Sequence, residues 1–291
     1  RDLLGNLVQV FNAIPDRIGG LCDVLVIDNN SADHTGNVLG EFESLLPVTA
    51  VREERPGLSN ARNRALSRFV GDAILFLDDD VSIHPNTLIV YHRALEQFPQ
   101  IDYFGGPIEV DWQDNRPRWL KSDDLVLLNG LFGKYQPASQ DLEYRADVMG
   151  PYGANFLLRR RLVDQIGDFN SNLGVKGETP GRGEETDFFE RARKLGARGF
   201  YLHRALVRHR FQLERLNLQY LYRYGIAKGQ ATGIPPAGYS GRLAISFLFR
   251  GLWQLVCGRI DRFYQCVINL GIIHGQSKGS QLVRPGDRES R

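Results

Sequence analysis

Short apolar runs alternate with helical stripes along the first two thirds of the chain. Residues 24–27 and 73–77 are continuous apolar runs, which are typical of strands buried on both faces of a parallel sheet. Apolar residues recur instead at spacings of three and four in segments that we expect to be helices: 1–18, 35–46, 60–70 and 86–98. This alternation predicts βα units and a doubly wound, mainly parallel sheet. Further strands are predicted at 103–110 and 199–207.

Acidic side chains follow two of the predicted strands. The run 24–27 ends on Asp28, and the run 73–77 continues directly into Asp78, Asp79 and Asp80. Ligands of doubly wound sheets bind beyond the carboxyl ends of the strands. Three adjacent carboxylates repel one another, and a divalent cation that prefers oxygen ligands, Mg²⁺ or Mn²⁺, would relieve that repulsion. Taken alone, the triplet fits a solvated acidic turn equally well.

A second group of acids opens a predicted helix after the glycine-rich loop 174–183. Glu185 lies three and four residues before Phe188 and Phe189, so it shares their inward face. The helix macrodipole favours acids in a first turn and accounts for Glu184 and Asp187. It does not account for a carboxylate that points toward the core. Such a group at the edge of a cleft is suited to act as a general base.

Two more positions bring polar side chains toward the same expected edge. A glycine-containing loop leads into the helix that carries Arg62 and Asn63 in its first turn, where an anion can be received. His209 ends a predicted strand between two arginines. A lone histidine is usually structural, but this location makes His209 a candidate third metal ligand.

Composition sets broad limits. The chain has 291 residues, of which 42% are hydrophobic and 24% charged, as in a soluble globular protein with a sizeable core. Cys22, Cys257 and Cys266 lack metal-ligand spacing, so neither a zinc site nor a disulfide framework is expected. No signal peptide precedes the first predicted element, and we expect a reducing, cytoplasmic location.

Charge is distributed unevenly. The net charge is +2, but residues 200–291 hold 14 Lys/Arg against 4 Asp/Glu, which gives +10 there and −8 elsewhere. A basic C-terminal third favours an anionic partner such as a phosphate-bearing substrate or lipid headgroups, although a solvated basic surface is also common. Since the region has no recognisable nucleic-acid-recognition motif, we expect no nucleic-acid partner.

Pro235 and Pro236 predict a boundary between a domain of residues 1–235 and a helical appendage of residues 236–291. Within the appendage, residues 243–257 and 263–273 are apolar but too short to span a bilayer comfortably. Arginines at 242, 250, 259 and 262 flank them. Two interpretations remain open: helices that lie on an anionic membrane, or a pair packed on the first domain. Residues 275–291 are expected to be disordered.

Four segments, in this order, resemble motifs of the family 2 glycosyltransferases of the GT-A fold: Val-Ile-Asp-Asn-Asn-Ser-Ala-Asp-His-Thr (26–35), Gly-Leu-Ser-Asn-Ala-Arg-Asn (57–63), Phe-Leu-Asp-Asp-Asp (76–80) and Gly-Glu-Glu-Thr-Asp-Phe (183–188). The resemblance implies a Rossmann-like α/β fold with a mixed, mainly parallel sheet flanked by helices. It also implies an inverting transfer from a nucleotide-diphosphate sugar, with a UDP-sugar preferred, to a saccharide or lipid-linked acceptor. Surface polysaccharide or glycolipid synthesis, with Mn²⁺ or Mg²⁺ as cofactor, would place the enzyme peripherally on the inner face of the cell membrane.

The resemblance also implies residue roles. Asp28 would contact the nucleotide base, and Arg62 and Asn63 would line the nucleotide pocket. Asp78 would lie toward the ribose and share the metal site, and Asp79 would belong to the donor site without a defined contact. The remaining roles are Asp80 as direct metal ligand, His209 as a further ligand, and Glu185, with Glu184 as alternative, as the catalytic base.

The chain departs from the family pattern in two ways. It begins on the helix that follows the family's first strand, so that strand is expected to be missing from this sequence. The base position holds Glu185, where the family usually has Asp.

Two other functions fit parts of the sequence. Asp78 to Asp80 also fit the nucleophile loop of haloacid-dehalogenase-like phosphatases, but that motif belongs on the first strand, and Asp28 would have no role. A catalytically silent module that binds a sugar nucleotide or polysaccharide is the other alternative, and the intact acids at both sites disfavour it.

Overall fold

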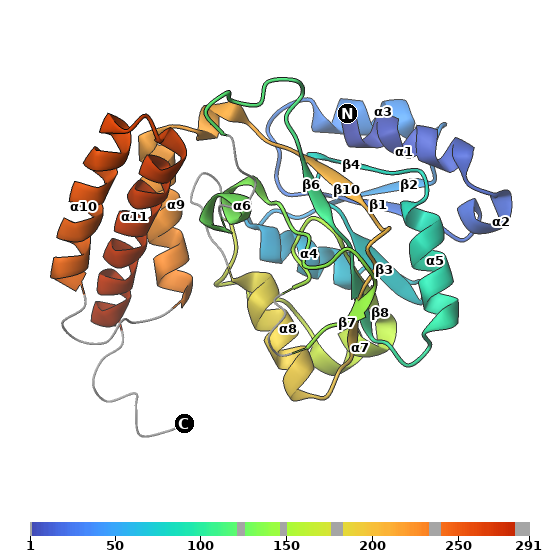
Figure 1. Ribbon diagram of the computed structural model, residues 1–291. Coiled ribbons are helices and arrows are strands. Elements are labelled where there is room, and N and C mark those ends of the chain that lie inside the picture. Colours follow the sequence, from blue (N-terminus) through green and yellow to red (C-terminus); the bar gives the residue numbers. More distant parts are fainter. Residues whose placement is uncertain (1, 121–125, 146–149, 176–182, 233–239, 283–291) are drawn as a thin grey trace. The chain divides into compact units, whose positions relative to one another are not determined.

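The structure, a computed structural model, describes residues 2–120, 126–145, 150–175, 183–232 and 240–282 (Figure 1). The chain forms two compact units. The sheet unit comprises the described residues of Arg1–Asp111, Gly133–Gly177 and Gly183–Arg210. The helical unit comprises those of Trp112–Phe132 and Phe211–Arg291.

The division into units differs from the predicted domains. The predicted boundary at Pro235 and Pro236 lies outside the described residues, and the units divide at Phe211 instead. The segment Trp112–Phe132, which falls within the predicted first domain of residues 1–235, belongs to the helical unit. Aromatic contacts connect this segment with the rest of the helical unit. The ring centroid of Trp112 lies 4.9 Å from that of Phe132 and 5.6 Å from that of Phe211.

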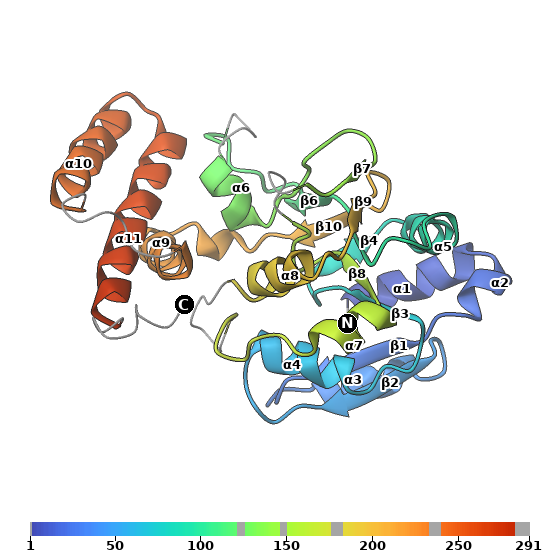
Figure 2. The ribbon, with the colours of Figure 1, turned by 90° about the horizontal axis from the view of Figure 1, so that it is seen from below.

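The N-terminal part of the sheet unit contains two parallel strands and their helices. Its elements are α1 (Asp2–Ala13), α2 (Asp16–Gly19), β1 (Val24–Asp28), α3 (Thr35–Phe42), β2 (Val48–Arg52) and α4 (Leu58–Leu66). The helix predicted over 1–18 is interrupted at Pro15, because a proline in a helix interior loses a hydrogen bond and clashes with the preceding turn. Strands β1 and β2 are parallel, with Asp28 opposite Arg52, and α3 and α4 lie against them (Figure 2).

A five-stranded sheet of order β3-β8-β5-β9-β7 follows. Its strands are β3 (Ala73–Phe76), β5 (Tyr103–Gly105), β7 (Leu142–Glu143), β8 (Phe156–Arg159) and β9 (Gly199–Tyr201). The third sheet has the order β4-β10-β6, with β4 (Val81–Ile83), β6 (Ile108–Asp111) and β10 (Val207–Arg210). Helices α5 (Thr87–Gln97), α7 (Arg160–Ile166) and α8 (Glu184–Lys194) complete the unit.

The mixed α/β architecture is confirmed, but the sheets are not mainly parallel. Among the described strands, three pairings are parallel and four are antiparallel. Strand β8 runs antiparallel to both of its neighbours, β3 and β5. Burial on both faces produces the same apolar run in either direction, so the sequence pattern does not reveal the direction of this strand.

Asn155 connects several segments of the sheet unit through hydrogen bonds. Its side chain is fully buried, and its Nδ2 donates to the carbonyl oxygens of Pro107 at 3.1 Å and Ala205 at 2.7 Å. Its Oδ1 accepts a hydrogen bond of 2.7 Å from the Tyr91 hydroxyl. Because all polar atoms of this amide are satisfied, the chain can turn from β5 into β6 at a fixed position. The strand predicted over 103–110 is therefore two strands.

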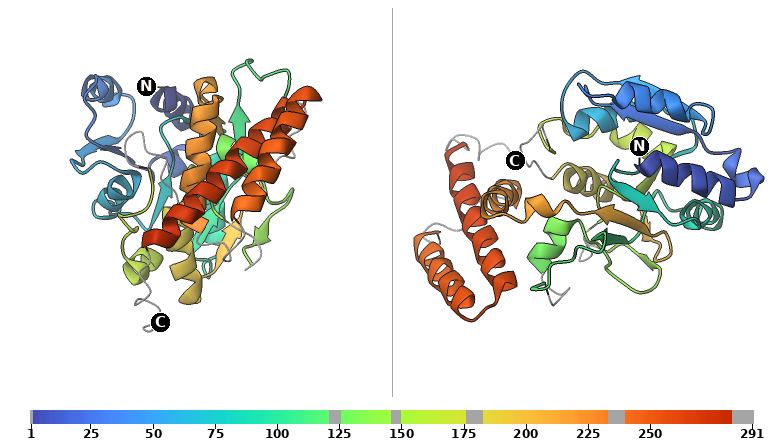
Figure 3. Two further views of the ribbon diagram at one scale, coloured as in Figure 1. Left: turned by 90° about the vertical axis from the view of Figure 1, so that its left-hand side faces the viewer. Right: turned by 90° about the horizontal axis from the view of Figure 1, so that it is seen from above.

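The helical unit contains α6 (Val126–Phe132), a 3₁₀ turn (Leu213–Arg215), α9 (Leu218–Thr232), α10 (Ser240–Val256) and α11 (Ile260–Leu282). Helix α11 packs against both α9 and α10 and lies between them (Figure 3). The expected C-terminal helical region is confirmed. Helix α11 continues to Leu282, past the start of the predicted disorder at 275, whereas 283–291 lie outside the described residues.

Glycines allow α9 and α11 to approach closely. Gly225 and Gly229 of α9 face the backbone of α11, and Gly271 and Gly275 of α11 face the backbone of α9. A Cβ at any of these four positions would collide with a backbone carbonyl oxygen of the facing helix. In each helix the two glycines are four residues apart and so lie on one face. None of the helices in the described part of the chain is both long enough and apolar enough to span a membrane.

Candidate active site

Arg62 lies at the centre of a buried cluster of charges. It is only 4% exposed, although it carries a guanidinium group. Its Nη1 lies 3.1 Å from Oε1 of Glu185 and 3.3 Å from Oε1 of Glu184. Its Nη2 lies 3.9 Å from Oδ1 of Asp78. Helix α4, the end of β3 and the first turn of α8 therefore meet at one cation.

A backbone carbonyl oxygen and two aromatic rings also contact this guanidinium. Nη2 donates to the carbonyl oxygen of Gly153 at 3.3 Å. The guanidinium carbon lies 5.5 Å from the ring centroid of Phe156 and 5.6 Å from that of Phe169. Stacking on aromatic rings and pairing with several carboxylates suits arginine better than lysine.

Asn63 has a structural role next to Arg62. Its Nδ2 donates to the carbonyl oxygen of Phe169 at 2.9 Å, and its Oδ1 accepts from the backbone N–H of Phe169 at 2.7 Å. The amide therefore binds the protein's own backbone, which places Phe169 beside Arg62. The contact of Asn63 with a nucleotide stays a prediction.

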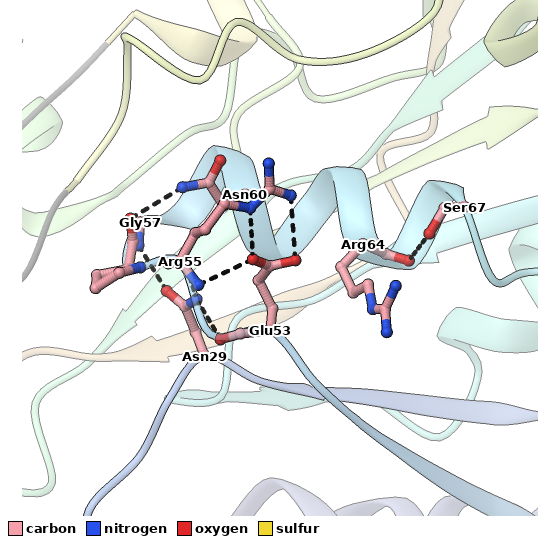
Figure 4. Close-up of polar contacts among 8 residues, drawn as sticks. Asn29, Glu53, Arg55, Gly57, Asn60, Arg64 and Ser67 are labelled. Atoms are coloured by element: carbon pink, nitrogen blue, oxygen red, sulfur yellow. Dashed lines mark hydrogen bonds and ion pairs between the residues drawn. The ribbon is translucent and has the colours of Figure 1, made fainter.

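A polar network fixes the entrance of α4 to the end of β1 (Figure 4). Oδ1 of Asn29 accepts from the backbone N–H of Gly57 at 2.7 Å, and its Nδ2 donates to the carbonyl oxygen of Arg55 at 2.8 Å. The buried carboxylate of Glu53 accepts from Nε of Arg55 at 2.8 Å. Sequence reasoning missed this use of Asn29, Glu53 and Arg55, although Asn29 directly follows the predicted strand end.

Asp28 is held as a carboxylate at the end of β1. Its Oδ1 accepts from the backbone N–H of Ser31 at 2.8 Å, and its Oδ2 lies 3.1 Å from Nη1 of Arg52. Hydrogen bonding to Ser31, together with the charge of Arg52, lowers the pKa of Asp28. Among the described contacts, none joins Asp28 directly to Arg62.

The three consecutive acids have different surroundings. Asp79 is exposed to solvent, whereas the protein covers most of the Asp78 side chain, which is only 34% exposed. Desolvation by the surrounding protein raises the pKa of Asp78 to about 6. Arg62 and His209 oppose this rise, while the charges of Asp80 and Glu185 add to it. Asp78 is thus the member of the triplet that interacts with the whole cluster.

Strand pairing places His209 beside Asp80. In the antiparallel pair β4–β10, His209 is opposite Val81, and the backbone N–H of Arg210 donates to the carbonyl oxygen of Asp80 at 2.9 Å. As a result, Nε2 of His209 lies 3.3 Å from Oδ2 of Asp80. The backbone at Gly133 leaves room for the imidazole, since a Cβ there would lie 3.2 Å from Nδ1 of His209.

Asp78, Asp80 and His209, which were predicted to share a metal ion, do not form a single group. Among the described residues, no cluster of three or more His, Cys, Asp or Glu side chains could hold a metal ion. Asp80 and His209 do form a pair, and a carboxylate with an imidazole suits Mn²⁺. Two protein ligands leave most of an octahedral coordination shell for ligand oxygens and water.

Glu184 and Glu185 differ in burial and in charge. Glu184 is 3% exposed, and this burial, with the neighbouring charge of Glu185, raises its pKa to about 7. The side chain of Glu185 is 20% exposed. Although burial acts in the opposite direction, Arg62 lowers the pKa of Glu185. The macrodipole explanation for Glu184 is therefore insufficient, because this side chain is buried rather than solvated.

Two glycines make room for these acids, and sequence reasoning missed both. A Cβ at Gly153 would collide with Oε1 of Glu185 and press on Nη2 of Arg62. Gly174 has a φ of +90°, and a Cβ there would lie 3.2 Å from Cδ of Glu184. Gly174 begins the glycine-rich loop that the sequence shows, but no local pattern connects either glycine with the acids.

Known proteins resemble this chain in sequence. A family model described as "Glycosyl transferase family 2" matches residues 4–167. The succinoglycan biosynthesis protein ExoM of Rhizobium meliloti is 25% identical over 285 residues, which cover 91% of this chain and 86% of that protein. The glucosyl-dolichyl phosphate glucuronosyltransferase of Haloferax volcanii is 24% identical over 205 residues, 68% of this chain. The matched part spans only 62% of that relative.

Solved structures show the same fold. The crystal structure of GalNAc-T7 with UDP, GalNAc and Mn²⁺ superposes with a TM-score of 0.51 at 18% identity. The match covers 75% of this chain and 43% of that one. The fold is therefore the α/β fold of the GT-A glycosyltransferases. Because the family match extends over more than half of the sequence, the chain belongs to the family 2 glycosyltransferases.

Proposed function

We propose that this chain is a metal-dependent, inverting glycosyltransferase that moves a sugar from a nucleotide-diphosphate donor to an acceptor hydroxyl. One observation carries the proposal: the contact of Arg62 with Asp78 and Glu185, residues from two motifs that are far apart in the sequence. Acids of the third and fourth family motifs therefore lie around one cation.

Asp80 and His209 are the residues that would hold Mn²⁺ or Mg²⁺. Their oxygen and nitrogen lie 3.3 Å apart at the end of β3. A divalent cation bound there neutralises the charge that develops on a diphosphate leaving group. The GalNAc-T7 structure, which contains UDP and Mn²⁺, supports the use of a metal by a protein of this fold.

We assign the role of general base to Glu185. It is held ionised by Arg62 and is partly exposed, so it can accept the proton of an acceptor hydroxyl. As that proton leaves, the acceptor oxygen attacks the anomeric carbon on the side opposite the departing nucleotide. This single displacement inverts the anomeric centre and needs no carboxylate nucleophile. Glu184 is the weaker candidate, because it is 3% exposed and keeps its proton up to about pH 7.

Asp28, Asp78 and Asp79 make up the proposed donor side. Asp28 would accept from the nucleotide base, and Asp78 would lie toward the ribose. Asp79 is assigned to the donor site without a particular contact. Arg62 acts on this side through Asp78 and Glu185 rather than as a lining residue. A UDP-sugar is the donor we favour, in line with the UDP in the GalNAc-T7 structure.

The acceptor we propose is a saccharide or lipid-linked hydroxyl. The name of the Haloferax relative includes a glucosyl-dolichyl phosphate, and that of the Rhizobium relative includes succinoglycan. Both names support synthesis of a glycolipid or polysaccharide. Such an enzyme would act from the cytoplasm, peripherally on the inner face of the membrane.

A thermal-shift panel of UDP, GDP and dTDP, each with and without Mn²⁺, tests the donor class. We expect one nucleotide to raise the melting temperature only when Mn²⁺ is present, because binding to the folded state stabilises it. Absence of a response to every nucleotide would contradict the proposal. Release of nucleotide from the corresponding sugar donor then distinguishes an enzyme from a catalytically silent binding module.

A further inference from the structure

Helix α10 presents a continuous apolar face. Six side chains, here named the α10 arc, are between 53% and 80% exposed: Ile245, Leu248, Phe249, Leu252, Trp253 and Val256. Their spacings of three and four place them on one side of the helix. Soluble proteins seldom leave so many large apolar side chains together in water, and such faces mark interaction sites.

The opposite side of α10 is occupied by α11. Gly251 is buried there, and a Cβ at this position would lie 3.3 Å from Cβ of Cys266 and 3.5 Å from the ring of Phe263. Helix α11 in turn packs its glycine face on α9. Helix α11 lies between α10 and α9 (Figure 3). The exposed α10 arc therefore belongs to the side of α10 that α11 does not cover.

The structure thus separates the two apolar segments of the appendage. Residues 263–273 lie in α11 and are largely used in packing between helices, as the buried Cys266, Ile268 and Gly271 show. Residues 243–257 lie mainly in α10, where the side chains of the α10 arc are exposed. Internal packing therefore accounts for one segment and leaves the other unexplained.

Charge indicates what covers the arc. Residues 240–282 contain five Lys/Arg and one acid, Asp261. Arg250, Arg259 and Arg262 are exposed. A two-fold contact between copies of the chain would bring these like charges together, which disfavours a second copy. Anionic lipid headgroups are complementary to them, and an apolar face with Trp and Phe beside arginines is typical of helices that lie in a membrane interface.

We propose that the α10 arc inserts into the headgroup–acyl boundary of an anionic bilayer, with α10 parallel to the membrane plane. The exposed arginines contact lipid phosphates, and Phe249 and Trp253 supply the largest buried surface. This inference concerns membrane binding only and does not depend on the proposed sugar transfer.

Cosedimentation of the full chain with lipid vesicles tests the inference. We expect binding to vesicles of phosphatidylcholine mixed with phosphatidylglycerol, and much weaker binding to phosphatidylcholine alone. The double variant Leu252→Gln with Trp253→Gln should lose binding by about tenfold or more, since apolar burial drives insertion. Arg250→Glu with Arg262→Glu should weaken binding to the anionic vesicles and reduce its dependence on salt.

Matched controls come from the sheet unit. Val70→Gln and Leu195→Gln replace apolar residues that are 89% and 61% exposed, and Arg68→Glu reverses an exposed arginine. These variants should bind vesicles as the wild type does. Trp253→Phe keeps an apolar ring, so it should still bind but lose the blue shift of tryptophan emission on vesicles.

Three results would overturn the inference. The first is no binding of the wild type to anionic vesicles, and the second is equal loss of vesicle binding in the control variants and the arc variants. The third is a wild-type dimer in sedimentation velocity that the arc variants dissociate, which would assign the arc to a second copy. Circular dichroism and thermal unfolding of each variant confirm that it is folded.

Discussion

Nη1 of Arg62 lies 3.1 Å from Oε1 of Glu185, and this contact joins the middle of α4 to the first turn of α8. Arg62 is buried and lowers the pKa of Glu185 against the effect of burial. The fixed cation therefore favours the ionised form of Glu185, which is the form that the proposed general base requires. Stability and turnover should both depend on this pair.

Replacement of the proposed base should affect chemistry more than donor binding. Glu185→Gln keeps the size of the side chain but cannot accept the acceptor proton, so we expect kcat to fall by about 10²–10⁴. Nucleotide affinity, measured by calorimetry, should stay close to that of the wild type. Glu190→Gln on the exposed side of α8 is the control and should retain full turnover. Undiminished activity of Glu185→Gln would show that another group is the base.

Loss of the central cation should destabilise the fold. Arg62→Met leaves the carboxyl groups of Glu184 and Glu185 without the cation that they share, and breaking such an ion pair typically costs about 3–5 kcal/mol. Urea unfolding measures the change in the free energy of unfolding. Arg68→Met, at an exposed position just after α4, should change it by less than about 0.5 kcal/mol. Similar values for the two variants would mean that the cluster contributes little to stability.

Gly153 should not tolerate a methyl group. In Gly153→Ala the new Cβ would collide with Glu185 and Arg62, so we expect a loss of about 1–3 kcal/mol of stability and a reduced kcat. In Gly40→Ala, by contrast, the added Cβ has no neighbour within 4 Å and lies in α3, where alanine favours the helix. Paired measurements of unfolding and turnover compare them. Equal effects of the two substitutions would contradict the crowded geometry at Gly153.

Glu184 should make stability fall as the pH rises. Its pKa is raised from 4.5 to about 7 on folding, so the folded state binds its proton more tightly than the unfolded state does. The stabilisation is fully present below pH 4.5 and is lost as the pH rises through about 7. The difference in unfolding free energy between wild type and Glu184→Gln should therefore decrease across that range.

Asp28 provides a control of opposite sign. Its pKa is lowered on folding, so its contribution is present above the ordinary value of 3.8 and is lost on acidification. Asp28→Asn should change stability most at neutral pH. A wild-type minus Glu184→Gln difference that is flat, or that rises with pH, would contradict the buried, protonated state of Glu184.

The sequence alone predicted that Asp28 and Asp78 to Asp80 follow strands and that Glu184 and Glu185 begin a helix. Each follows a clear local pattern, because an apolar run or a glycine-rich loop ends at the acid. The roles of Arg62 and Gly153 were not predictable in this way. Their environments depend on strands and helices that meet only in the folded chain, and a helical arginine or a loop glycine carries no local sign of burial.

The same limit explains the errors in the fold. The direction of β8 results from its pairing with β3 and β5, and the break between β5 and β6 lies where Asn155 donates to Pro107 and Ala205. The membership of Trp112 in the helical unit results from its ring contacts with Phe132 and Phe211. Apolar periodicity reports which face of an element is buried but not which distant segment covers it.

The central claim is that a nucleotide donor binds at the Asp80–His209 pair in a metal-dependent way. Calorimetric titration of UDP in the presence and absence of Mn²⁺ tests this claim most directly. The wild type and the control Asp72→Asn, an exposed acid before β3, should bind UDP tightly only with Mn²⁺. Asp80→Asn should lose about tenfold or more of that affinity, because it removes a charged oxygen ligand. Mn²⁺-dependent binding that is equally strong in Asp80→Asn and the wild type would contradict the account.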